Sequence, residues 1–238
     1  MTTLIYLKEC GSTNDEILKY IHAGSNHFSG VYTFNQTNGR GQYGNGWKTS
    51  ERKNIALTVA IPENYVKTSD SLFNFYTALA VREFAANLTK HEVKIKWPND
   101  LIIGNKKVCG MLIEKKKVLN RQYYIVGIGI NVQQENFEDL PRAGSLLTQT
   151  GIPFPLTETA EALYNFLICK AKDNPTGQDV LQCYNTFLYR KKEVAVFKKN
   201  NSSQNGMISH ADELGNIWIE LEHDGLQKFY HKEIEMLY

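Results

Sequence analysis

The sequence has 238 residues, of which 42% are hydrophobic and 22% are charged, and its formal net charge is +2. This composition predicts a globular protein with one large domain, or one domain and a small second one. The low net charge gives no reason to expect a nucleic acid or a membrane surface as partner, and no apolar run approaches the roughly 18 residues of a membrane span. The start of the chain lacks the features of a secretory signal, and the four scattered cysteines form no disulfide or metal-binding pattern, so we expect free thiols in a reducing cytoplasm.

The first quarter of the chain is predicted to contain three strands and a helix. Residues 4–9 (LIYLKE) and 30–36 (GVYTFNQ) have the composition of strands. Between them, Thr13 and Glu16 have the spacing of a capping box, which predicts a helix that begins near Ser12 or Thr13. Residues 54–61 (NIALTVAI) alternate large and small side chains, which predicts the third strand.

The middle of the chain combines one helix with a run of strands. Apolar residues recur at helical spacing between residues 71 and 89, which predicts a helix. Residues 93–97 alternate, residues 108–114 follow a turn at 104–105, and residues 123–132 read as a buried strand. Because these strands follow one another without helices between them, we expect an α+β fold with a mixed, largely antiparallel sheet and packed helices.

The last part of the chain changes in composition near residue 190. Residues 157–189 contain two helical patterns, whereas short apolar runs separated by polar turns follow them. We therefore expect a main domain at residues 1–189, the domain to which the resemblance described below assigns catalysis, and a small β-barrel domain at residues 190–238. A barrel of this size is only marginally stable alone, so it is expected to pack on the larger domain.

The segment TNGRGQYGNGW, residues 37–47, contains four glycines, an arginine and a tryptophan. Its GRGQYG core matches the dinucleotide fingerprint, but that fingerprint requires a helix at the third glycine, and turn-forming residues follow Gly44. Glycines allow close backbone approach to a ligand, Arg40 can bind a phosphate or carboxylate, and Trp47 offers a flat face to a ring. The alternative is a surface turn with a core tryptophan.

The segment KWPND, residues 96–100, ends a strand, and Asn99 and Asp100 are typical turn residues. The alternative for Asp100 is that its carboxylate helps to hold a metal. Lys107 begins the next strand beside Gly110, where it can direct its ammonium group toward an anion that gains negative charge. Spacing alone favours the alternative that Lys107 is a solvated member of a lysine pair.

The segment GIGIN, residues 127–131, places glycine at alternate positions of a strand, so Gly127 and Gly129 are expected on one face. A bare sheet face accommodates a flat ring or another backbone, and close helix packing is the alternative. The amide of Asn131 offers both a donor and an acceptor.

These segments together resemble the biotin protein ligases, also called biotin–[acetyl-CoA-carboxylase] ligases. The resemblance covers the chain from about residue 4 to the C-terminus and rests on four motifs in this order: GSTN (11–14), Q-x-x-GRG…W (36–47), KWPND with K-x-x-G (96–110) and GIGIN (127–131). Any one motif alone would be weak, whereas the combination is specific.

The resemblance implies an enzyme that makes biotinyl-5′-adenylate from biotin and MgATP and then transfers biotin to a lysine of a biotin carboxyl carrier protein. ATP with Mg²⁺ and biotin are then substrates, no tightly bound cofactor is expected, and neither DNA nor a membrane is a partner. The implied fold is a class II synthetase/biotin–lipoate ligase-like sheet followed by an SH3-like β-barrel. The chain starts almost at the first catalytic strand, so a monofunctional enzyme without an N-terminal DNA-binding domain is expected; homodimer formation is left open.

The resemblance also implies roles for individual residues, and it leaves the ligands of the metal unknown. Lys107 and Arg40 are the expected catalytic cations. The expected contacts of ATP are Arg40, Trp47, Lys107 and Asn131. The expected contacts of biotin are Ser12, Thr13, Asn14, Gln36, Gly39, Arg40, Gly41, Gln42, Lys107, Gly110, Gly127 and Gly129. The loop 37–48 is expected to close over the adenylate and exclude water.

One position departs from the family pattern. Many members carry a second arginine in a GRGR motif, whereas this chain has Gln42. One cation fewer is then available to hold the acyl-adenylate, so we expect weaker retention of that intermediate.

Two other functions are alternatives to a biotin protein ligase. A lipoate–protein ligase shares the fold and chemistry, but Gln36 and the S-T-N segment favour a ureido ring over a dithiolane. A non-catalytic adenylate-binding module is the second alternative, and the presence of Lys107, Arg40 and KWPND argues against it.

Overall fold

A seven-stranded mixed sheet organises the larger part of the molecule, in the strand order β1-β2-β5-β9-β8-β7-β6. The computed structural model describes residues 3–22, 27–47, 50–138, 140–173, 175–200 and 202–237. β1 pairs with β2 in parallel, and the other neighbours in this sheet pair antiparallel, which confirms the predicted mixed, largely antiparallel sheet. The strands are β1 (Thr3–Leu7), β2 (Ser29–Thr33), β5 (Asn54–Pro62), β6 (Val93–Lys96), β7 (Asp100–Ile103), β8 (Lys106–Val118) and β9 (Arg121–Asn131).

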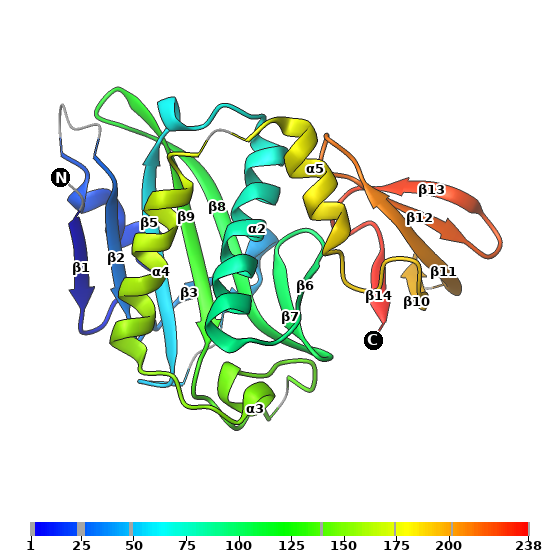
Figure 1. Cartoon of the computed structure of the whole chain (residues 1–238), viewed down its shortest axis with the longest axis horizontal. Helices are drawn as coiled ribbons and strands as arrows, with labels where there is room; N and C mark the ends of the chain where they lie inside the picture. The colour runs from blue at the N-terminus through cyan, green and yellow to red at the C-terminus, as the bar shows by residue number, and fades with distance from the viewer. Residues whose placement is uncertain are drawn as a thin grey trace.

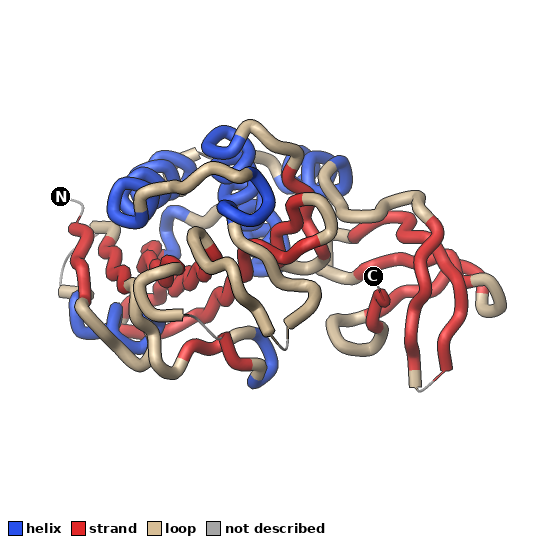
Figure 2. The backbone as a smooth tube through the Cα atoms, turned by 90° about the horizontal axis from the view of Figure 1, so that it is seen from below, coloured by secondary structure: helices blue, strands red, loops and turns tan. Residues whose placement is uncertain are grey.

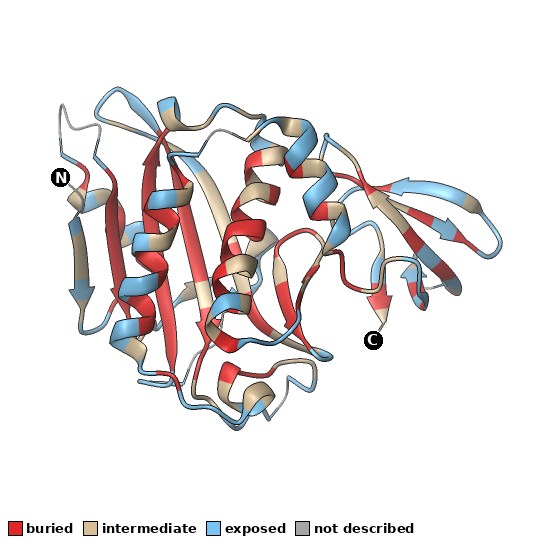
Figure 3. Ribbon diagram, viewed as in Figure 1, coloured by how far each residue is buried: buried red, intermediate tan, exposed pale blue. Residues whose placement is uncertain are grey.

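Helices α2 (Asp70–Thr89) and α4 (Leu156–Lys170) lie against one face of this sheet (Figure 1). Their inward sides and the central strands are buried, which makes this interface the main hydrophobic core (Figure 3). Gly30 of β2 shows how closely the layers approach, because an added Cβ atom there would lie 2.5 Å from the ring of Tyr164 in α4. Helix α5 (Gly177–Thr186) packs on α2, and its Tyr184 ring stacks on Phe75 with 3.8 Å between centroids.

The opposite side of the sheet carries loops and short elements, which are seen below the strands in Figure 2. The short elements of the chain are α1 (Thr13–Glu16), η1 (Ile17–Tyr20), β3 (Gly39–Arg40), η2 (Gln42–Gly44), β4 (Gly46–Trp47), η3 (Glu63–Tyr65) and α3 (Leu146–Thr150). This arrangement leaves part of the sheet surface available to a ligand instead of covering it with a long helix.

A second, five-stranded antiparallel sheet follows α5 in the order β13-β12-β11-β10-β14, so β13 and β14 are its edge strands. Its strands are β10 (Val194–Lys199), β11 (Ser202–Ala211), β12 (Ile217–Leu221), β13 (Gly225–Phe229) and β14 (Glu235–Leu237). Hydrogen bonds join it to the larger part of the molecule: Trp97 Nε1 donates to the carbonyl of Gly215 at 3.0 Å, and Ser71 Oγ donates to that of Leu214 at 3.0 Å. The small unit therefore packs on the larger one, as its size predicts.

Two local features differ from the sequence expectation. Helix α1 begins at Thr13 with Ser12 as its N-cap, but the side chain of Ser12 makes no capping hydrogen bond, and Thr13 Oγ1 contacts Gln36 and Thr58. The capping box is found at the short helix α3, which the sequence analysis did not predict, and there Ser145 and Thr148 cap each other. Tertiary hydrogen bonds thus replace the local cap at the first site.

Candidate active site

The floor of the site is a row of small residues that crosses neighbouring strands. Ala56, Gly129, Gly110 and Asp100 are directly paired in succession from β5 through β9 and β8 to β7. Paired residues in a sheet point to the same face, so the two glycines leave a flat, bare surface between Ala56 and Asp100. Gly127 lies two positions from Gly129 and shares its face, which confirms that prediction.

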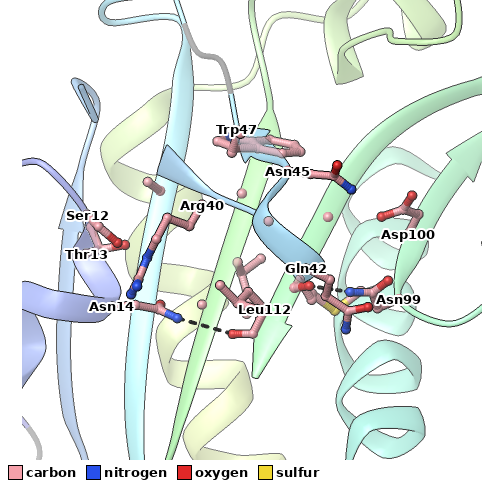
Figure 4. A pocket seen from close by; sticks show the side chains of 18 of the residues that line it. Ser12, Thr13, Asn14, Arg40, Gln42, Asn45, Trp47, Asn99, Asp100 and Leu112 are labelled. Carbon is pink, nitrogen blue, oxygen red and sulfur yellow. Dashed lines mark hydrogen bonds between the residues drawn. The ribbon is translucent and has the colours of Figure 1, made fainter. Parts of the chain in front are cut away.

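A pocket of about 120 Å³ lies over this floor (Figure 4). It contains most of the residues that the sequence analysis assigned to one site, although these come from distant parts of the chain. The predicted residues that line it are Ser12, Thr13, Asn14, Gln36, Arg40, Gly41, Gln42, Trp47, Lys107, Gly110, Gly127 and Gly129.

Two predicted residues lie outside this lining. Asn131 is buried, and its Nδ2 donates a hydrogen bond to the carbonyl of Gly144 at 2.9 Å. Gly39 lies in β3 of the glycine loop and pairs with Trp47, where an added Cβ atom would be 2.4 Å from the carbonyl oxygen of Trp47. Packing therefore explains the glycine at position 39, since only a glycine allows the two backbones to approach this closely.

One end of the pocket is formed by a hydrogen-bonded polar cluster from α1, Gln36 and β5. Gln36 Oε1 accepts from the backbone N–H of Thr13 at 2.9 Å and from its hydroxyl at 3.1 Å. Thr58 Oγ1 lies 2.8 Å from Thr13 Oγ1 and 2.7 Å from Asn14 Oδ1. Asn14 also covers Gly127, because an added Cβ atom on that glycine would lie 2.1 Å from Asn14 Oδ1. The cluster fixes amide and hydroxyl groups at one end of the bare floor.

The glycine loop forms a small hairpin above the floor. β3 and β4 pair antiparallel, Gly44 in the turn has a φ of 79°, and the next described elements are the strands β4 and β5, which differs from the helix that a dinucleotide-binding loop requires at this point. The Trp47 ring rests on the bare strand, because an added Cβ atom on Gly129 would lie 2.4 Å from its Cε2 atom. The buried indole N–H of Trp47 has no hydrogen-bond partner among the described residues. Residues 48 and 49 lie outside the described residues.

Arg40 extends from this loop to two carboxylates. Its Nη2 lies 2.7 Å from Asp15 Oδ1 and 3.3 Å from Glu114 Oε2. Asn14 Nδ2 donates to the same Glu114 oxygen at 2.9 Å. Ion pairs therefore connect the loop to α1 and β8 at the polar end of the pocket.

Lys107 occupies the other end. Its Nζ lies 2.7 Å from Asp100 Oδ1 and 5.7 Å from the centroid of the Trp47 ring. Its side chain is 32% exposed and bends over Gly110, where an added Cβ atom would lie 3.3 Å from Nζ. Lys107 is therefore part of the pocket rather than a solvated member of a lysine pair, whereas its neighbour Lys106 bonds to the carbonyl of Pro141.

Several lining residues were missed by the sequence analysis. Asn99 and Asp100 were interpreted as turn residues, yet both line the pocket, and Asn99 Nδ2 donates to the carbonyl of Met111. Their place beside Trp97 and Pro98 in the KWPND motif could have identified them. Asn45 is within the glycine loop. His231, from the segment after β13, had no sequence signal, because only the packing of the second sheet brings it to the pocket.

The environment changes the pKa values of groups at both ends. Burial alone would raise the pKa of Glu114, but hydrogen bonds from Asn14 and Lys116 and the charge of Arg40 lower it below its ordinary value. Burial lowers the pKa of His231, as do the nearby charges of Lys96, Lys232 and Lys107, while Asp100 opposes this effect. A depressed pKa keeps the Glu114 carboxylate charged and the His231 ring neutral near pH 7.

Within the described ranges, no group of three or more histidine, cysteine, aspartate or glutamate side chains could hold a metal ion. In the same part of the chain, no helix has the length and apolar character to cross a membrane.

Comparison with known proteins identifies relatives of this architecture. Over 145 residues, the chain is 32% identical to a biotin–[acetyl-CoA-carboxylase] ligase of Mycobacterium tuberculosis, and the match covers 58% of this chain and 53% of that protein. Over 139 residues it is 29% identical to the bifunctional ligase/repressor BirA of Bacillus spizizenii, which covers 58% of this chain and 42% of the relative. The matches thus span about half the length of these relatives.

The fold matches that of a solved structure over almost its whole length. The biotin protein ligase from Aquifex aeolicus, solved in complex with biotin and ATP, superposes with a TM-score of 0.80. The superposition covers 99% of this chain and 98% of that one, at 24% identity. Residues 12–131, about half of the chain, match the biotin/lipoate A/B protein ligase family. These residues include α1, the glycine loop and the glycine floor, and the protein belongs to that family.

Proposed function

We propose that this protein is a biotin protein ligase. It activates biotin with MgATP to biotinyl-5′-AMP and then transfers biotin to a lysine of a biotin carboxyl carrier protein in the cytoplasm. The observation that supports this most is the joint placement of Arg40, Trp47 and Lys107 over one bare glycine floor. Each of these side chains is common, but their combination around one flat slot suits a carboxylate, a phosphate and a ring together.

The polar end of the pocket favours biotin over lipoate. A ureido ring has two N–H donors and one carbonyl acceptor, whereas a dithiolane ring has neither. The amides of Asn14 and Gln36 and the hydroxyl of Thr13 supply matching acceptors and donors in a fixed cluster. A dithiolane ring offers this cluster no hydrogen-bonding atom, so the cluster gives it no specific recognition.

The first step joins the carboxylate of biotin to the α-phosphorus of ATP, and pyrophosphate leaves. Negative charge spreads over the phosphoryl oxygens, and the magnesium ion of the substrate complex neutralises part of it. Lys107 and Arg40 supply the protein's cations for this charge. Both side chains currently pair with carboxylates, Lys107 with Asp100 and Arg40 with Asp15 and Glu114, so the ligand has to compete with these ion pairs.

The second step transfers the acyl group to an amine of the carrier protein, and AMP leaves. The acyl-adenylate is a reactive mixed anhydride that water would hydrolyse. The glycine loop and the Trp47 ring cover the floor and are suited to exclude water from it.

Mass spectrometry of a carrier domain tests the proposal. Incubation of the domain with this protein, biotin and ATP is expected to add one biotinyl group, and omission of ATP is expected to abolish the addition. Lipoate in place of biotin distinguishes a lipoate ligase, since preferential lipoyl addition would refute the proposed substrate. Biotin-dependent release of pyrophosphate distinguishes an enzyme from a binding module, which would release none.

A further inference from the structure

The proposed transfer step needs a group that accepts a proton. The attacking ε-amine of a lysine has an ordinary pKa of about 10.4, and its nitrogen loses a proton as the amide forms. An enzyme commonly supplies a general base for such a proton, and histidine is the most frequent choice. In the proposed mechanism Lys107 and Arg40 act through their charges, so neither of them is this general base.

Four described side chains of the lining carry an ionisable group: Arg40, Asp100, Lys107 and His231. A guanidinium such as that of Arg40 stays protonated in proteins and cannot accept a proton. Lys107 and Asp100 are paired with each other, with 2.7 Å between Nζ and Oδ1. His231 is therefore the member of this set with the ordinary chemistry of a proton acceptor near neutral pH.

The position of His231 matches the end of the pocket where phosphate chemistry is expected. It lines the same pocket as Lys107 and Asp100, and its charge state is coupled to both of these residues. Figure 4 shows Asp100 on the opposite side of the pocket from Asn14, so His231 is associated with the phosphate end and not with the polar ring end. Its ring contacts Trp97 edge-on, with 5.5 Å between centroids.

His231 also borders a second cavity of about 510 Å³ between the two sheets. Asn45 and His231 line both cavities, so these two residues separate the pocket from the neighbouring space. The neighbouring cavity has apolar walls that include Trp97, Ile217 and Ile234. A proton acceptor at this boundary is close to the reacting end of the pocket without occupying its floor.

The surroundings of His231 keep its ring uncharged at neutral pH, so the ring is available to accept a proton. Burial lowers its pKa, and the charge of Asp100 in β7 opposes this effect. Three nearby cations lower the pKa further: Lys96 of β6, Lys232 of its own segment and Lys107 of β8. The neutral imidazole has one ring nitrogen that accepts a proton. Protonation near several cations carries an electrostatic cost, which favours the prompt return of the proton to solvent.

We propose that His231 is the general base of the transfer step, an inference that rests on the proposed ligase function. The amine nitrogen of the carrier lysine attacks the acyl carbon of biotinyl-5′-AMP and forms the C–N bond. The bond between the acyl carbon and the phosphate oxygen breaks, and AMP leaves with that electron pair. The proton lost by the nitrogen passes to a ring nitrogen of His231.

The test measures the two steps separately in the variants His231→Gln and His231→Ala. Adenylation is followed as biotin-dependent release of pyrophosphate in a single turnover. Transfer is followed by mass spectrometry, with synthetic biotinyl-5′-AMP and a purified biotin carboxyl carrier domain, from about pH 4.5 to about pH 9, a range that includes pH values below the ordinary pKa of histidine. His210→Gln is the matched control, because His210 stacks on Trp218 in the second sheet and lies outside the pocket lining.

We expect transfer to slow by roughly 10²-fold or more in both His231 variants, a much larger loss than that of adenylation. The wild-type transfer rate falls more steeply at acid pH, where His231 becomes protonated, and this extra slope is absent from the variants. Imidazole in the buffer is expected to accelerate transfer by His231→Ala and to leave adenylation unchanged.

Unchanged transfer in His231→Gln would overturn the inference. A parallel loss of both steps without rescue by imidazole would also overturn it, since that result assigns His231 a structural role between the sheets. Failure of the ligase proposal is distinct, because the wild-type protein itself would then release no pyrophosphate with biotin.

Discussion

The ammonium group of Lys107 and the carboxylate of Asp100 form an ion pair of 2.7 Å between the neighbouring strands β8 and β7, at the rim of the glycine floor. The two side chains are 32% and 19% exposed, so water screens the pair only in part. Asp100 is paired directly with Gly110, the residue over which Lys107 bends. The pair therefore holds a cation over the floor before any ligand arrives.

Lys107→Ala is the most direct test of this cation. We expect adenylate formation to fall by roughly 10²–10³-fold, because one preorganised positive charge is lost from the transition state. The fold should persist, since the lysine side chain is partly exposed. Pyrophosphate release measures the first expectation, and thermal unfolding measures the second. Lys106→Ala is the neighbouring control and should retain activity; equal activity of the two variants would remove Lys107 from the mechanism.

Arg40→Ala separates catalysis from stability. The Arg40 and Asp15 side chains are 40% and 59% exposed, and ion pairs of this kind contribute about 0–1 kcal/mol. We therefore expect little change in the free energy of unfolding but a loss of adenylation comparable to that of Lys107→Ala. Arg40→Lys keeps the charge without the planar fork and should retain intermediate activity. Strong destabilisation of Arg40→Ala would instead make this ion-pair group a structural element.

The sequence was sufficient to predict the sheet, because alternation and turn signals are local properties. Strands 54–61 and 123–132 and the helix at 71–89 correspond closely to β5, β9 and α2. Gly127 and Gly129 could be assigned to one face, because alternation along a strand fixes the direction of each side chain. The boundary between domains at residue 190 stays a prediction, and the two sheets that flank it agree with its position.

Contacts between distant segments could not be predicted in the same way. Nothing near Glu114 indicates that it binds Arg40 and Asn14, because that cluster exists only after α1, β3 and β8 meet. His231 reaches the pocket through the packing of the second sheet. Thr13 was interpreted as a helix cap because a local rule applied, whereas tertiary partners engage its hydroxyl.

Gly129→Ala should disturb the glycine floor. The added methyl group would lie 2.4 Å from Cε2 of Trp47, so the indole ring has to move. Overpacking of this kind typically costs about 1–3 kcal/mol, and a penalty of that size on ligand binding corresponds to a loss of roughly 5- to 160-fold in affinity. Calorimetric titration with ATP and with biotin measures the loss. Gly11→Ala is a matched control, because nothing lies within 4 Å of its added Cβ atom; equal affinities for both variants would contradict the tight contact.

Gln42→Arg should improve retention of the intermediate. Gln42 lines the pocket together with Asp100, and an arginine there adds a cation near the adenylate phosphate. We expect a larger fraction of biotinyl-5′-AMP to remain with the protein after rapid gel filtration. Gln122→Arg adds the same charge at an exposed position and should leave retention unchanged. Equal retention by both variants would mean that general charge attraction, and not position 42, determines the effect.

Glu114→Gln tests how an ionised carboxylate inside the polar cluster contributes to stability. The pKa of Glu114 is below its ordinary value in the folded protein, because the hydrogen bonds of Asn14 and Lys116 and the charge of Arg40 outweigh the effect of burial. The charged form is therefore favoured by folding, and its contribution is present at neutral pH and lost as the pH falls through the lowered pKa. We expect Glu114→Gln to reduce the free energy of unfolding at pH 7, and the difference from the wild type to shrink below about pH 4. Urea unfolding at several pH values measures this difference.

The exposed substitution Glu135→Gln serves as control and should have little effect on the free energy of unfolding at any of these pH values. If the destabilisation by Glu114→Gln grew as the pH falls, the ionised Glu114 carboxylate would not contribute to the free energy of unfolding.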